Sequence, residues 1–289
     1  MTGADLAILA LDVAGYVLIL TLVALGLAII FGLLRVISMA HGEFLMLGAY
    51  LVLVVEGAGG SFWLGLALAG PAVALVGLLV EAVVIRRVYR RLLDTILATW
   101  GVSLVIRQAV TLVFGPASHS IDLPVDAAVA FPGFEYPVYR LFIMALSLAL
   151  VGATAWLFFA TRFGLAARAV IADRDMAACL GYDTRAFDRA TFAYGSALAG
   201  VAGAAMAPLI SVDPQMGVGF LVPAFLSVLV GGLGSIAGPL AGAGTLGAID
   251  GLVARALSPV WAQVAVLAIA VVLIRLFPKG LLGRRGRSP

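Results

Sequence analysis

The residues best suited to binding chemistry are polar residues inside long apolar runs, and the first group is Ser38, His41, Gly42 and Glu43. A glycine between a histidine and a carboxylate can open a helix. The free N–H groups of a helix start attract a carboxylate or carbonyl oxygen. Glu43 opposes an anion there, because its own carboxylate can accept bonds from the same N–H groups. The group predicts either a polar-solute site or a structural turn with a local cap.

A second group lies in the run 92–114, where Thr95, Thr99 and Ser103 recur every four residues. This spacing puts the three hydroxyls on one face of a helix. The stripe either lines a solute pathway or forms hydrogen bonds between helices. Arg107 follows at about 22 Å from the start of the run. We expect its side chain to snorkel outward, with pairing to a carboxylate or binding of a solute carboxylate as alternatives.

A third group is rich in glycine, between two apolar runs. Glycines permit non-helical backbone at membrane depth where protein or a cavity covers it, and they also permit close helix packing. Both interpretations remain open. The candidates for a solute pathway in this group are Gly232, Gly234 and Ser235.

Residues for catalysis are absent from the sequence. The two histidines, His41 and His119, lie far apart, and Cys179 is the single cysteine. The sequence contains no metal-ligand set, no acyl-transfer constellation and no G-x-x-x-x-G-K-[ST] phosphate-binding motif. We predict that this chain is not an enzyme and binds no metal or cofactor directly. Cys179 is expected to be a small buried residue.

The elements that position these residues must lie in lipid. Hydrophobic residues make up 63% of the chain and charged residues 11%, and the mean hydropathy is +1.16. An ordinary soluble domain has about 25% charged residues, so these charges cannot coat an apolar core. Several runs reach the roughly 20 residues of a membrane-spanning helix and lack the alternation of barrel strands. The fold class is predicted as all-α, a transmembrane helical bundle.

Apolar runs between charged or turn-forming breaks predict eight or nine spans. The second, seventh and eighth runs are short or rich in glycine and are expected to be broken or half helices. The first run lacks the basic segment of a signal peptide, so it is expected to remain as a helix with its N-terminus outside. The runs are at about 7–34, 42–56, 62–85, 92–114, 140–160, 190–210, 220–233, 239–257 and 261–277.

The basic residues predict the orientation. With the N-terminus outside, all but three of the 18 Lys and Arg residues fall on the inner side; the exceptions are Arg107, Arg140 and Arg255. The positive-inside rule therefore places the N-terminus out and the C-terminus in. The formal net charge of +3 reflects this topology and does not indicate nucleic-acid binding.

Two long connections follow from this topology within a single domain over 1–289. The segment 115–139 has four prolines and no Lys or Arg. It is predicted as an extracytoplasmic loop that covers the outer mouth. The segment 161–189 is cytosolic and contains a predicted short helix, capped by Asp173 and ended by Gly181. So short a helix is marginal alone and must pack on another surface, either a partner protein or this chain.

This short helix carries a resemblance to a known family. Ala177-Ala178, then two residues, then Gly181 resembles the coupling loop of bacterial ABC importer permeases, which docks in a cleft of the ATPase subunit. The usual spacing there is three residues, so this is a shortened variant. The resemblance implies an ATPase-coupling role for Asp173, Met176, Ala177, Ala178 and Gly181.

Further segments resemble the branched-chain amino acid permeases within that family. The likeness covers residues from about 20 to 283. Its main segments are Phe31 to Phe44, Leu47 to Tyr50, Thr99 to Leu104, Phe114 to Pro116, Gly231 to Pro239 and Phe277 to Gly283.

The resemblance implies a multi-pass subunit of the bacterial inner membrane that imports a small polar solute. A branched-chain amino acid is the first expectation, and urea or a short amide is the alternative, since 173–193 resembles the urea-type branch equally well. The implied partners are a related second permease, two cytosolic ATPase subunits that use ATP, and a periplasmic binding protein. A stand-alone channel or an integral membrane enzyme is the alternative of another class.

Overall fold

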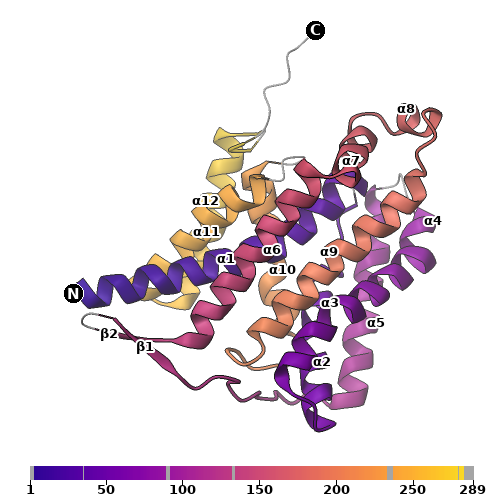
Figure 1. Ribbon diagram of the computed structural model, residues 1–289. Helices are drawn as coiled ribbons and strands as arrows, with labels where there is room; N and C mark the ends of the chain where they lie inside the picture. The colour runs from indigo at the N-terminus through magenta and orange to yellow at the C-terminus, as the bar shows by residue number, and fades with distance from the viewer. Residues whose placement is uncertain are drawn as a thin grey trace.

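The computed structural model describes residues 3–34, 36–88, 92–131, 134–232, 237–278 and 280–282. Gly234 and Ser235 lie outside the described residues. The described part of the chain is a bundle of α-helices with one short β-hairpin (Figure 1). The elements are α1 Gly3–Leu34, α2 His41–Gly57, α3 Phe62–Val80, the π-helical turn η1 Glu81–Ile85, α4 Arg86–Val88, α5 Leu92–Phe114, β1 Ala128–Phe131, β2 Phe134–Pro137, α6 Val138–Ala160, α7 Arg162–Ala172, α8 Arg174–Cys179, α9 Thr184–Met206, α10 Met216–Gly231, α11 Gly238–Ala256 and α12 Pro259–Leu276.

The helix boundaries depart from the predicted runs mainly around the segment 161–189. This segment contains two helices, α7 and α8, where one was predicted. The run predicted at 190–210 begins earlier, as α9, because Asp183 accepts hydrogen bonds from the N–H groups of Arg185 and Ala186 at 3.0 and 3.1 Å. A charged stretch that looked like loop is therefore a capped first turn.

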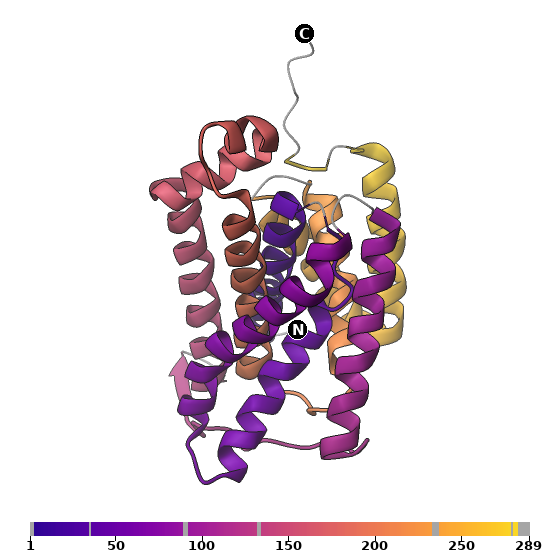
Figure 2. The same ribbon diagram turned by 90° about the vertical axis from the view of Figure 1, so that its right-hand side faces the viewer.

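The segment 115–139 contains the hairpin, the one departure from the all-α class among the described residues. β1 pairs with β2 antiparallel, with Ala130 opposite Glu135, and the rings of Phe131 and Phe134 stack at 5.2 Å. Four-residue strands are too short to show an alternating pattern, so the sequence did not reveal them. The connection before β1 runs along one end of the bundle, which we call the hairpin end; α7 and α8 lie at the opposite, α8 end (Figure 2).

Four helical segments among the described residues have the length and apolar composition to cross a membrane: Ala4–Leu34, Phe62–Val88, Leu93–Phe114 and Val138–Ala160. Met216–Gly231 and Val260–Leu276 are apolar but shorter. Large apolar side chains on the outside are exposed, such as Leu79 (64%) and Leu112 (78%). A polytopic all-α membrane protein is confirmed, whereas the count of eight or nine spans stays a prediction.

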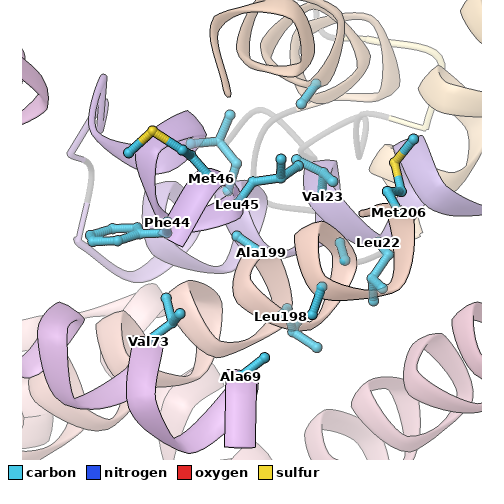
Figure 3. Packing of buried hydrophobic residues seen from close by; sticks show 14 of the residues in the cluster. Leu22, Val23, Phe44, Leu45, Met46, Ala69, Val73, Leu198, Ala199 and Met206 are labelled. Carbon is cyan, nitrogen blue, oxygen red and sulfur yellow. The ribbon is translucent and has the colours of Figure 1, made fainter. Parts of the chain in front are cut away.

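The core lies where α9 packs against α1, α2 and α3 (Figure 3). Leu22 and Val23 of α1 lie near Leu45 of α2, and Leu198 and Ala199 fill the space from the side of α9. Small residues on α9 let its neighbours approach closely. A Cβ atom on Gly203 would lie 1.9 Å from the carbonyl oxygen of Leu45.

The same close approach occurs between α2 and α9 at Gly48, where an added Cβ would lie 1.9 Å from the carbonyl oxygen of Gly200. We expect Gly48→Ala to lower the free energy of unfolding by about 1–3 kcal/mol, because two backbones must move apart. Thermal denaturation in detergent measures this. Gly152→Ala in α6 is the matched control, since nothing lies within 4 Å of its added Cβ. Equal melting temperatures for the two variants would contradict the packing.

Candidate functional site

The start of α2 lies deep inside the bundle. Nε2 of His41 lies 3.0 Å from the carbonyl oxygen of Val23, eleven residues before the end of α1 at Leu34. At 1.5 Å per residue, this level is about 16 Å from that end. α2 therefore begins inside the bundle, as expected for the second run, and continues toward the hairpin end (Figure 1).

Glu43, in the first turn of α2, is the centre of a buried polar cluster. Its Oε1 accepts a hydrogen bond from Oγ of Ser103 at 2.8 Å and forms an ion pair with the guanidinium of Arg107. The Glu43 side chain is 2% exposed and the Arg107 side chain 21%. The expectation that Arg107 snorkels was wrong, because a carboxylate within reach neutralises its charge at membrane depth. The alternative of a carboxylate partner holds.

Thr99, one turn before Ser103, bonds α5 to the connection between α1 and α2. Its Oγ1 accepts a bond from the N–H of Met39 at 3.1 Å and lies 3.3 Å from the carbonyl oxygen of Ile37. The predicted stripe on α5 therefore faces the bundle. These polar contacts join α5 to the start of α2.

Four buried polar atoms before and within the first turn of α2 and on α5 have no hydrogen-bond partner among the described residues. They are Oγ of Ser38, Nδ1 of His41, Oε2 of Glu43 and Nε of Arg107. A buried polar group without a partner costs about 1–3 kcal/mol, so Oε2 of Glu43 and Nε of Arg107, which belong to one ion pair, are two groups that a polar occupant such as water or a solute would satisfy.

The glycine candidates have packing roles. An added Cβ on Gly42 would lie 2.5 Å from the carbonyl oxygen of Gly217, so Gly42 lets α10 approach the start of α2. Gly232 has φ of +110° at the end of α10, about 22 Å along that helix from Gly217. There the N–H of Leu282 donates to the carbonyl of Gly231 at 3.0 Å. The structure therefore does not bring Gly232 to the Glu43 cluster.

A cavity of about 920 Å³ lies at the α8 end. Thr95 of α5 lines it and is thus separated from Thr99 and Ser103, which face the connection 36–40 and Glu43. The cavity's charged residues come from η1, α4, α8 with its N-cap Asp173, and α9, and two ion pairs join some of them. Asp188 binds Arg174 through both carboxylate oxygens, and Glu81 lies 3.8 Å from Arg189. Sequence reasoning missed these pairs because their partners lie on different elements.

The sequence matches the family described as "Branched-chain amino acid transport system / permease component" over residues 9–275. The chain belongs to this family. It is 29% identical to the high-affinity branched-chain amino acid transport system permease protein LivH of Salmonella typhimurium, covering 91% of each chain. It is 27% identical to BraD of Pseudomonas aeruginosa, another permease protein of a high-affinity branched-chain amino acid transport system, again over 91% of each chain. No solved structure gives a significant match.

The permease's segment 161–189 forms the caps that the sequence predicted. Oδ1 of Asp173 accepts the N–H of Met176 at 2.9 Å, and Gly181 has φ of +87° with its N–H bonded to the carbonyl of Ala178. Ala177 is 2% exposed and packs inward, whereas Met176 (58%) and Leu180 (70%) face outward. Cys179 is exposed, which overturns the expectation of a buried thiol, because α8 lies on the surface of the bundle.

The segment 115–139 of the permease is bonded to other parts of the chain at two points. His119 and Val212 exchange backbone hydrogen bonds of 2.9 Å. Farther along, Asp12 of α1 accepts a bond from the hydroxyl of Tyr136 at 3.0 Å and pairs with Arg140. Burial raises the pKa of Tyr136, and the bond to Asp12 acts in the same direction. The connection is thus fixed across the hairpin end, and its role as a cover of the outer mouth stays a prediction.

We expect Arg174→Ala to loosen α8 from α9, because it removes the partner of the Asp188 carboxylate, which is 1% exposed. The loss is about 2 kcal/mol, below that of a fully buried pair, since Arg174 is 35% exposed. Chymotrypsin should cut this segment about thirtyfold faster, because cleavage follows the population of the opened segment. Arg185→Ala, an exposed arginine of the same segment, is the control. Equal cleavage rates in the two variants would contradict a structural role for the pair.

Proposed function

We propose that this chain is the membrane-spanning subunit of a bacterial ABC importer that moves a branched-chain amino acid inward, using ATP hydrolysed by partner subunits. The single observation that carries the proposal is the family match over residues 9–275. The likeness to LivH and BraD over 91% of the chain supports the branched-chain amino acid as solute. The chain itself supplies no ATPase motif.

The proposed orientation has the N-terminus outside and the α8 end in the cytosol, in the inner membrane. The distribution of Lys and Arg supports it, since nearly all of these residues fall at or beyond the α8-side ends of the apolar runs. The remaining partners are a related second permease and a periplasmic binding protein. In this orientation the hairpin end meets the binding protein.

The proposed ATPase contact is α8 with its flanking residues. Met176 and Leu180 expose large apolar surface in a segment otherwise rich in charge, and such a patch favours docking of a partner protein. Ala178 and Gly181 are exposed beside them and permit close approach. Ala177 would contribute from within, by holding α8 against its own chain. The docked ATPases would move α8 and rock the bundle between its two access states.

The transport test uses proteoliposomes that contain the permease, its partner permease and the ATPases. Leucine carried by the binding protein should enter only with ATP, and radiolabelled uptake measures it. Uptake of urea or a short amide in place of leucine would favour the alternative assignment, an importer of urea or a short amide. Solute flux through the purified chain without ATPases would favour a stand-alone channel and overturn the proposal.

The single cysteine tests both the orientation and the docking surface. Cys179 is exposed, so a membrane-impermeant maleimide should label it in inside-out vesicles and not in intact cells. Bound ATPase subunits should slow this labelling by about tenfold or more, since a docked surface excludes the reagent. A Cys179→Ser variant gives the background. Labelling in intact cells would contradict the proposed orientation. Equal labelling rates with and without ATPase subunits would show that α8 is not part of the interface.

A further inference from the structure

The Glu43 cluster has features of a ligand site that the ABC permease assignment leaves unused. It joins an acidic and a basic side chain from different helices, and each keeps one unpaired atom, Oε2 of Glu43 and Nε of Arg107. Two side chains of opposite charge that lie beside one another, each with one unpaired atom, favour an occupant that carries both signs itself.

We propose that the Glu43–Arg107 pair is the intramembrane site for the zwitterionic head of the transported amino acid, an inference that rests on the proposed function. The solute ammonium donates to Glu43 while the solute carboxylate accepts from Arg107. The ion pair between the two side chains is replaced by two ion pairs to one solute. The net charge of the site remains zero throughout, which hydrocarbon surroundings require.

The charges of the cluster select among solute classes. A simple anion is repelled by the carboxylate of Glu43, and a simple cation is repelled by the guanidinium of Arg107. Urea and short amides carry no charges and cannot stabilise the two side chains once they separate. A zwitterion meets both demands, so the pair favours an amino acid over an uncharged amide.

The packing of α5 provides a route to the pair. α5 is attached to the start of α2 through the polar contacts of Thr99, Ser103 and Arg107, and its opposite face is exposed (Figure 2). Ser103 lies eight residues from Thr95, which lines the cavity at the α8 end, or about 12 Å along the helix. The connection 36–40, held by Thr99, separates cavity and pair. A shift of α5 would release that connection and open the site.

The test compares ion-pair variants in the complete complex in proteoliposomes, with leucine on saturating binding protein. Glu43→Gln and Arg107→Gln should each lower uptake by about tenfold or more, the factor for losing one charged hydrogen bond to the solute. The double variant Glu43→Gln/Arg107→Gln should stay equally low. So should the reversed pair Glu43→Arg/Arg107→Glu, because it presents the solute with the opposite charge order. Thr245→Val in α11, whose hydroxyl donates to carbonyls of its own helix, is the control and should change uptake by at most about twofold.

A direct readout avoids dependence on how the charge variants fold. Ser103→Cys in a Cys179→Ser background places a thiol beside Glu43. Leucine should slow alkylation of this thiol by a small reagent, whereas urea should leave the rate unchanged.

The outcomes separate the two proposals. Near-normal uptake in the double or reversed variant, or no protection by leucine, would show that the pair only links α2 to α5, while wild-type uptake keeps the importer assignment. Failure of the wild-type complex to take up leucine would overturn the proposed function itself.

Discussion

Hydrocarbon offers no hydrogen-bond partners, and this constraint governs every polar group in the bundle. Most hydroxyls on the helices meet it locally: Ser196 and Ser227 donate to the carbonyls of Phe192 and Pro223, four residues earlier. The Glu43 cluster meets it differently, through partners on another helix. Polar bonding between helices thus holds α5 in place. Apolar packing and close glycine contacts hold the centre of the bundle together, and hydroxyl bonds of Tyr139 and Tyr194 add to the contact between α6 and α9.

The central position of α9 follows from this packing and connects the two functional regions. Near its start, Asp188 holds Arg174 of α8, and near its end Gly203 touches the backbone of α2 at Leu45. Leu45 is two residues from Glu43. A displacement of α8, as proposed for ATPase docking, would therefore reach the start of α2 through one continuous helix. Tight backbone contacts transmit such a shift better than flexible side chains, because neither backbone can yield separately.

The sequence predicted the features that depend on local chemistry. Low charge indicated lipid, a four-residue spacing put Thr95, Thr99 and Ser103 on one face, and Asp173 and Gly181 marked the ends of α8. It could not predict features that depend on distant partners. Arg107 looked like a snorkelling residue because Glu43 is 64 residues away. Cys179 looked buried because exposure depends on where α8 sits.

The mutual neutralisation of Glu43 and Arg107 also explains how a transporter can keep charges at this depth in both of its access states. A single buried charge would favour whichever state exposes it to water, and the bundle would stop there. A pair carries no net charge when it is closed, so the empty site can cross the occluded state. A bound zwitterion restores the same balance, and its apolar side chain adds no further demand for hydrogen bonds. An uncharged solute leaves the separated side chains unbalanced, so its passage through the occluded state is opposed.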